Sequence, residues 1–230
     1  MSATIYFVRH GEVEHHRADV GLTETGQAQA RRAADALAAG FRPGEPLVIA
    51  HAPTQRTYET AAAIHSRLAA HFPLPPPQPD EALANVRFIL HTNGSAHLAE
   101  PSLTYAHFAP GSAYLDSQPP ARAAFFRNFW TSRDPMGYWL ATPSAGGAEL
   151  PEAVLHRLLT RAREIFAAPA ADPSHHILVT HSGALRVLLR HAFGHDPGEP
   201  DFCGIVTLAA AAQPRRARLS YRHAAAEVEI

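Results

Sequence analysis

Three short apolar runs, each followed within two residues by a histidine, constrain the fold of this chain more than any other feature. The runs span residues 5–8, 47–50 and 177–180, and the histidines are His10, His51 and His181. Runs of this length and composition are typical of buried strands. Strands of a largely parallel sheet end at the same edge, and open α/β sheets bind their ligands at that edge. We therefore predict that the three imidazoles converge on one site.

Helical patterns separate these strands. Thr23 and Ser182 are good N-caps for two of the expected helices, and Gly194 is a good terminator. The prolines between residues 73 and 79 exclude a helix or a central strand there. The spacing of apolar residues predicts helices over 24–39, 54–71, 150–165 and 182–192, and late strands over 205–209 and 218–221 with a turn at Gln213-Pro214. This alternation of strands and helices predicts an α/β sandwich.

Composition and charge exclude several classes of protein. Apolar residues make up 46% of the 230-residue chain, enough for a folded domain with a sizeable core. The formal net charge of −1 supplies no field that would attract nucleic acid or an anionic membrane. No window approaches about 18 uninterrupted apolar residues, and the N-terminus lacks a signal-peptide pattern. We expect a cytoplasmic protein, and the single Cys203 excludes an intramolecular disulfide.

Residues 85–147 form an insertion that is rich in aromatic residues and chain breakers. Short helices are expected near 120–131, and ten of the Phe, Tyr and Trp residues fall between 85 and 140. Most of these rings are expected to build a small helical core. Any ring that faces the site would suit a substrate with an organic, partly apolar body.

Two arginines near the strand ends point to an anion. Arg9 precedes His10, and Arg56 falls in the first turn of the helix predicted over 54–71. A helix N-terminus disfavours a cation unless an anion binds there. Taken alone, Arg56 is better explained as an exposed arginine that points into water. With an anion at this edge, Arg9 and Arg56 form a two-armed clamp on a phosphate.

A clamped phosphate assigns roles to two histidines. His10, placed in line with phosphorus, is the natural nucleophile, and the flanking guanidinium groups favour its neutral form. His181 has a proton to donate to the non-bridging oxygens, on which charge accumulates. A metal site is the rival use of clustered histidines. We expect none, because two arginines repel a divalent ion and no carboxylate follows at ligand spacing.

These residues fall in four motifs that resemble the histidine phosphatase superfamily, which includes the cofactor-dependent phosphoglycerate mutases. The motifs are Arg-His-Gly-Glu at 9–12, Leu-Thr-Glu-Thr-Gly-Gln-Ala at 22–28, Gln-Arg-Thr-Tyr-Glu-Thr-Ala at 55–61 and Val-Thr-His-Ser-Gly at 179–183. The resemblance covers residues 1–71 and 148–212. It implies a three-layer α/β/α sandwich with a mostly parallel central sheet, in a single domain of residues 1–230 with an insertion or cap at about 85–147.

The resemblance also implies site residues. His10 would be the phosphorylated nucleophile, and Arg9, Arg56 and His181 would form the phosphate pocket, with no metal or organic cofactor. His16 stands near the position where the family usually has asparagine, and it is expected to donate a hydrogen bond to phosphate in that residue's place. Contacts to substrate are also expected from Thr23, Asn85 and Ser182. His51 stands where the family often has serine, and either lines the rim of the site or is solvated.

The proton donor departs from the family pattern. Family members commonly carry a glutamate two residues after a leucine in the segment that follows the second helix, and here Leu83 places Asn85 at that position. An amide cannot protonate a leaving oxygen. Asp80 and Glu81 lie just upstream, either as solvated loop charges or as the missing acid. We take Glu81 as the predicted acid.

The sequence therefore predicts a metal-independent phosphomonoesterase that acts on a small-molecule phosphate ester through a phosphohistidine. One alternative is a phosphotransferase of the phosphoglycerate-mutase type, although the insertion supplies few cations for a second acidic group. The other is a phospholigand-binding or regulatory protein weakened in turnover by Asn85. The sequence leaves the oligomeric state open, with a homodimer as one option.

Overall fold

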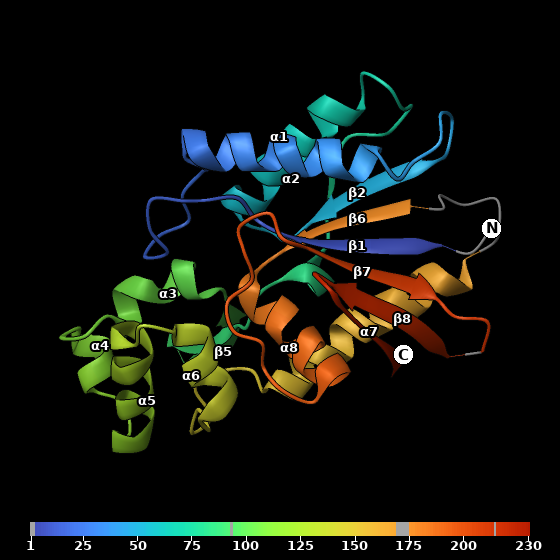
Figure 1. Ribbon diagram of the computed structural model, residues 1–230. Coiled ribbons are helices and arrows are strands. Elements are labelled where there is room, and N and C mark those ends of the chain that lie inside the picture. The colour runs from blue at the N-terminus through green and yellow to red at the C-terminus, as the bar shows by residue number, and fades with distance from the viewer. Residues whose placement is uncertain (1–2, 93, 169–174, 214) are drawn as a thin grey trace.

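A seven-stranded mixed sheet forms the centre of the protein (Figure 1). The computed structural model describes residues 3–92, 94–168, 175–213 and 215–230. The spatial order of the strands is β3 (Gln78–Pro79), β2 (Leu47–His51), β6 (His175–Thr180), β1 (Thr4–Arg9), β7 (Ile205–Ala210), β8 (Arg216–Tyr221) and β9 (Ala224–Glu229). The strands β3, β2, β6 and β1 are parallel to one another. The neighbouring pairs β1–β7, β7–β8 and β8–β9 are antiparallel.

The expected α/β class is therefore confirmed, but the sheet is mixed and not mostly parallel. The strands β7, β8 and β9 follow one another along the chain with only short connections. Short connections permit antiparallel pairing alone, because a parallel neighbour needs a long crossover. The sequence analysis missed β9, whose alanine-rich run lacks the alternating large apolar residues that mark a strand.

Helices cover both faces of the sheet, which confirms the three-layer sandwich. Helices α1 (Glu24–Ala38) and α2 (Gln55–Leu68) pack on one face, and α7 (Pro151–Ala167) and α8 (Ser182–Phe193) pack on the other (Figure 1). Side chains of a strand point to alternate faces, so β1 serves both layers. Ile5 and Phe7 join the core beneath α7 and α8, whereas Val8 joins the core beneath α1 and α2.

Two of the three helix-end residues expected from the sequence hold the expected positions. Thr23 caps α1 as expected, since its side chain accepts a hydrogen bond from the backbone N–H of Gly26. Gly194 ends α8 in the left-handed conformation at φ 76°. Ser182 was expected to be the N-cap of α8, but His181 occupies that position in extended backbone and Ser182 is the first helical residue. The expected turn at Gln213-Pro214 includes Pro214, which lies outside the described residues.

The insertion forms a hairpin and a group of short helices at the edge of the sheet where β1, β2 and β6 end (Figure 1). Its elements are β4 (Phe88–Thr92), β5 (Ser95–Ala99), α3 (Pro101–Phe108), α4 (Ala113–Asp116), α5 (Pro120–Thr131) and α6 (Pro135–Ala141). Helix α5 confirms the prediction near 120–131. Phe88, Phe108 and Phe126 are fully buried against one another, as expected for a local core. None of the helices in the described part of the chain is both long and apolar enough to span a membrane.

Candidate active site

A cavity of about 260 Å³ opens at the ends of the central strands, beneath the helices of the insertion. Six of the residues expected at the site line it: His10, His16, Arg56, Asn85, His181 and Ser182. Three others do not: Arg9, Thr23 and Glu81. The remaining wall comes from the insertion and from Glu199, and includes Pro101, Ser102, Phe129, Trp130, Arg133, Asp134, Pro135 and Met136.

His10 is held as a neutral imidazole with one defined tautomer. Its Nδ1 lies 2.8 Å from the carbonyl oxygen of Gly11. A carbonyl only accepts, so Nδ1 carries the proton and Nε2 keeps its lone pair. Burial is the largest cause that holds the pKa of His10 well below its usual value, and Arg56 and then Arg9 lower it further. His10 therefore presents an unprotonated nitrogen at neutral pH.

His181 lies beside His10 because their strands are neighbours in register. Arg9 pairs with Thr180 in the parallel ladder, and the backbone N–H of His10 donates to the carbonyl of Thr180 at 2.9 Å. The two imidazole centroids are 5.3 Å apart. The pKa of His181 is held well below its usual value by burial and then by Arg56. Two of the three histidines that follow the strands therefore meet.

The proton of His181 can also be placed. Its Nδ1 lies 3.3 Å from Nη2 of Arg56, and a guanidinium only donates. Nδ1 therefore accepts, and the one proton of the neutral ring is on Nε2. Nε2 is buried without a hydrogen-bond partner among the described residues. Oε1 of Glu100 lies 3.5 Å from it, too far for a good hydrogen bond, so this donor can turn to a ligand that comes closer.

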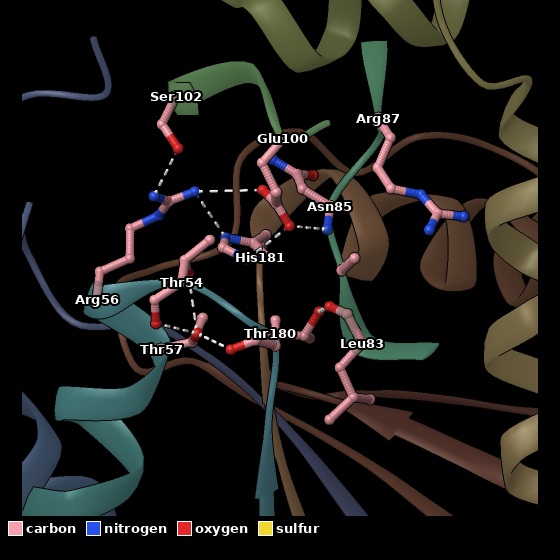
Figure 2. A network of polar contacts seen from close by, with 12 residues as sticks. Thr54, Arg56, Thr57, Leu83, Asn85, Arg87, Glu100, Ser102, Thr180 and His181 are labelled. Carbon is pink, nitrogen blue, oxygen red and sulfur yellow. Dashed lines mark hydrogen bonds and ion pairs between the residues drawn. The ribbon is translucent and has the colours of Figure 1, made fainter. Parts of the chain in front are cut away.

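Arg56 extends from the first turn of α2 into the centre of the polar network (Figure 2). Its Nη1 donates to Oγ of Ser102 at 3.1 Å, and its Nη2 contacts His181 and lies 3.5 Å from a carboxylate oxygen of Glu100. Asp19 accepts from Nη1 of Arg56 at 3.3 Å and from the backbone N–H of Gln55 at 3.0 Å. A carboxylate thus lies at the helix end where an anion was expected.

Arg9 does not line the cavity, and its guanidinium contacts residues 199–202. Its Nη2 pairs with Glu199 at 2.8 Å, its Nη1 donates to the carbonyl of Pro200, and its guanidinium lies 4.0 Å from the ring centroid of Phe202. The predicted two-armed clamp is therefore unequal. Arg56 lines the cavity, whereas Arg9 acts on His10 by its charge in this arrangement.

Asn85 occupies a site built by long-range contacts. The hydroxyl of Thr180 donates to the carbonyl of Leu83 at 2.6 Å, and Arg157 of α7 donates to the carbonyls of Ala84 and Asn85. The Oδ1 of Asn85 is buried with no hydrogen-bond partner among the described residues. A Cβ on Gly183 would lie 2.5 Å from this Oδ1, so a larger residue at 183 would displace the Asn85 side chain.

Glu100 is the functional candidate that sequence reasoning missed (Figure 2). Its side chain is 3% exposed, Oε1 accepts from the backbone N–H of Asn85 at 2.8 Å, and Oε1 also lies 3.5 Å from Nε2 of His181. Burial is the main cause that raises the pKa of Glu100 to about 7, against the opposing pull of Arg56. Oε2 is buried without a hydrogen bond. A carboxyl poised near neutral pH therefore lies beside the position where the family glutamate is replaced.

No local signal could have found Glu100. It stands directly before α3, after a hairpin in which Phe88 pairs with Ala99. This pairing returns the chain to the neighbourhood of Asn85. The relevant proximity is thus a property of the hairpin register, and not of the residue types around Glu100.

Glu81 and Thr23 lie elsewhere. The Glu81 side chain is 75% exposed in the short 3₁₀ turn Glu81–Leu83, and its nearest cation is Arg87 at 4.0 Å. The hydroxyl of Thr23 caps α1 and donates to Oε1 of Glu12 at 2.8 Å. Asp80, the other candidate acid, pairs with Arg161 at 2.7 Å. The structure brings none of these three to His10.

Three further residues complete the inventory. The ring of His16 lies 5.6 Å from that of His10, and Ser182 lines the cavity from the start of α8. His51 is neither solvated nor at the rim. It is 7% exposed, and its Nδ1 contacts the carbonyl of Ala52 at 2.7 Å. No group of three or more His, Cys, Asp and Glu side chains among the described residues is arranged to hold a metal ion.

A neutral histidine, an arginine and a second imidazole donor at the C-terminal edge of an α/β sheet support a phosphoryl-transfer enzyme. The family model of the histidine phosphatase superfamily (branch 1) matches residues 5–99. This match confirms the resemblance to the histidine phosphatase superfamily over the residues that it covers, which hold the first three of the four motifs. Among curated proteins, no sequence matches this chain.

Solved structures share the fold over nearly the whole chain. A mycobacterial glucosyl-3-phosphoglycerate phosphatase is similar with a TM-score of 0.57 and 21% identity, over 96% of this chain and 97% of that chain. A putative α-ribazole-5′-phosphate phosphatase from Escherichia coli has a TM-score of 0.58 and 15% identity, over 97% of each chain. A phosphoglycerate mutase from Bacillus anthracis has a TM-score of 0.56 and 14% identity, over 96% of this chain and 91% of that chain.

Proposed function

We propose that the protein is a metal-independent phosphomonoesterase that hydrolyses a small-molecule phosphate ester through a phosphohistidine at His10. The observation that carries this proposal is the state of His10. It lines a buried cavity as a neutral ring, its proton is fixed on Nδ1, and Nε2 keeps a lone pair beside Arg56 and His181. A nucleophile of this kind needs no metal to become reactive.

The first step transfers the phosphoryl group to His10. Nε2 attacks phosphorus, the N–P bond forms, and the bond from phosphorus to the ester oxygen breaks with its electron pair on that oxygen. Arg56 and the Nε2–H of His181 stabilise the charge that accumulates on the non-bridging oxygens. The leaving oxygen takes up one proton and departs as an alcohol.

Glu100 is the proposed source of that proton, in place of Glu81. It is the buried carboxyl beside the cavity wall, and a pKa of about 7 keeps a useful fraction protonated at neutral pH. Glu100 does not itself line the cavity, whereas the adjacent Pro101 and Ser102 do, so we propose that a water carries the proton to the leaving oxygen. In the second step water attacks phosphorus, the N–P bond breaks, and the Glu100 carboxylate recovers a proton from that water. Inorganic phosphate leaves.

The test is the phosphoenzyme. The protein is mixed with a phenyl phosphate that carries a radiolabelled phosphoryl group, quenched in denaturant, and divided between acid and alkali. We expect label that survives alkali and is lost in acid, together with release of inorganic phosphate. His10→Gln should carry no label. His51→Gln is the matched control, because His51 also follows a central strand and bonds the next carbonyl, yet lies outside the cavity.

Each of the other outcomes supports a different function or overturns the proposed one. Label that persists in a folded His10→Gln variant overturns His10 as the nucleophile. Tight binding of phosphate esters without label or phosphate release supports the phospholigand-binding alternative. Interconversion of 3- and 2-phosphoglycerate at a rate above phosphate release supports the mutase alternative and overturns the proposed hydrolysis.

A further inference from the structure

The insertion contributes several apolar side chains to the wall of the cavity. Phe129 and Trp130 at the end of α5, Met136 in α6 and Pro101 at the start of α3 contribute to it. The Trp130 ring is fixed by edge contacts to Tyr105 and Phe129, with centroids 4.8 and 5.0 Å apart. A preformed aromatic surface favours a flat or apolar ligand body over a hydrated one.

Two carboxylates on the same wall are neutralised. Arg186 of α8 is 1% exposed, and its guanidinium pairs with Asp134 and with Asp196. Glu199 lies between Arg9 at 2.8 Å and Arg186 at 3.3 Å. The hydrogen bond from Arg186 is the largest cause that lowers the pKa of Asp134, so this carboxylate stays ionised and paired. Neither carboxylate is left to attract a cationic ligand.

Unlike these paired carboxylates, Arg133 is a charged residue without a partner among the described residues. It lines the cavity next to Asp134, its side chain is exposed, and it has neither a hydrogen bond nor an ion pair with any residue that the structure describes. The other arginines between residues 85 and 147 are occupied away from the cavity: Arg87 by Glu149, Arg122 by the carbonyl of Ile89, and Arg127 by Asp116. The insertion thus presents one unpaired cation to the ligand beside an apolar wall.

We propose that the substrate is a phosphate monoester with an aromatic or otherwise flat apolar body that carries a second anionic group, such as a carboxylate, bound by Arg133. The phosphate takes the His10 end, the body lies against Trp130 and Met136, and the anion reaches Arg133. This proposal rests on the proposed function only in the placement of the phosphate. A cavity of about 260 Å³ lies near the lower limit of roughly 300–1,000 Å³ for small-molecule sites, so the body is small.

The test uses non-hydrolysable phosphonates, so that it does not depend on turnover. Methylphosphonate, benzylphosphonate, and the 3- and 4-carboxy derivatives of benzylphosphonate are titrated into the protein by calorimetry at one fixed salt concentration. We expect benzylphosphonate to bind at least about fivefold more tightly than methylphosphonate, because its ring covers the apolar wall. We expect one carboxy isomer to bind roughly threefold to tenfold more tightly than benzylphosphonate.

Two arginine variants test whether Arg133 is responsible for the tighter binding of the carboxy isomer. Arg133→Gln should reduce the ratio of affinities between the carboxy isomer and benzylphosphonate to near one. Arg127→Gln removes an equally exposed charge on the neighbouring helix, which pairs with Asp116 outside the cavity, and should keep the wild-type ratio. Raising the salt concentration should lower the wild-type ratio toward that of Arg133→Gln.

The outcomes separate this inference from the proposed function. Equal binding of methylphosphonate and benzylphosphonate, no preference for either carboxy isomer, or a preference that survives Arg133→Gln overturns the inference, whatever the phosphoenzyme experiment shows. An Arg133-dependent preference without any phosphoenzyme supports the binding site and overturns the phosphatase. No binding of any phosphonate to the wild-type protein overturns the inference.

Discussion

Replacing Glu100 by glutamine should change how the stability of the protein depends on pH. The carboxyl is 3% exposed, and burial raises its pKa from 4.5 to about 7. The folded protein then binds a proton between these pH values that the unfolded chain has released. Stability falls as pH rises wherever the folded state binds more protons, so this contribution is complete below pH 4.5 and is lost as pH rises to 7.

The size of the effect follows from the shift. A change of about 2.5 pKa units, at about 1.4 kcal/mol for each unit, corresponds to about 3 kcal/mol of unfolding free energy. Glutamine resembles the protonated acid and does not titrate. The attraction between Arg56 and the ionised carboxylate is already part of the pKa of about 7, and the cost of an amide N–H that faces Nη2 has the same size at every pH. The difference between variant and wild type should therefore move by about 3 kcal/mol in favour of the variant from pH 4.5 to 8.

Urea unfolding followed by circular dichroism at pH 4.5, 5.5, 6.5 and 8, at constant ionic strength, measures this difference. Other titrating groups contribute to both proteins and largely cancel. Glu81→Gln is the matched control, because it removes a carboxyl that is 75% exposed, and its difference from wild type should stay flat. A Glu100→Gln difference that varies by less than about 0.5 kcal/mol over this range would refute the argument that the carboxyl is buried and protonated near neutral pH.

Three further predictions concern the reaction. Glu100→Gln should slow the hydrolysis of alkyl phosphates by roughly 10²–10⁴ and that of aryl phosphates with good leaving groups much less, since only a poor leaving group needs the acid. Glu81→Gln should change neither rate by more than about twofold. Equal losses on both substrates after Glu100→Gln contradict the role of Glu100 as the acid. Wild-type kcat/KM for alkyl phosphates should decrease above about pH 7, as Glu100 ionises, and this decrease should be absent in Glu100→Gln. Incubation with a strong chelator should leave turnover unchanged and vanadate should inhibit it, because His10 is reactive without a metal; a loss of turnover that added Mg²⁺ or Zn²⁺ restores would show that the mechanism is incomplete.

Much of the framework was readable from local sequence. The strands that precede His10 and His181, the helix with Thr23 at its N-cap and the end of α8 at Gly194 all depend on residues within a few positions of one another. Local preference and short-range hydrogen bonds decide such features, so the sequence alone predicts them well. The meeting of His10 and His181 followed from one further rule, that parallel strands end at one edge.

The proton donor and the aim of the arginines could be decided only by the tertiary structure. Glu81 lies close to Asn85 in the chain but points into water, whereas Glu100 reaches Asn85 because a hairpin turns the chain back. Arg9 adjoins His10 in sequence, yet its guanidinium pairs with Glu199 and does not line the cavity. The physical reason is the same in each case. Burial and charge pairing depend on which distant segments pack together, and those contacts decide whether a side chain meets the substrate, another side chain or solvent.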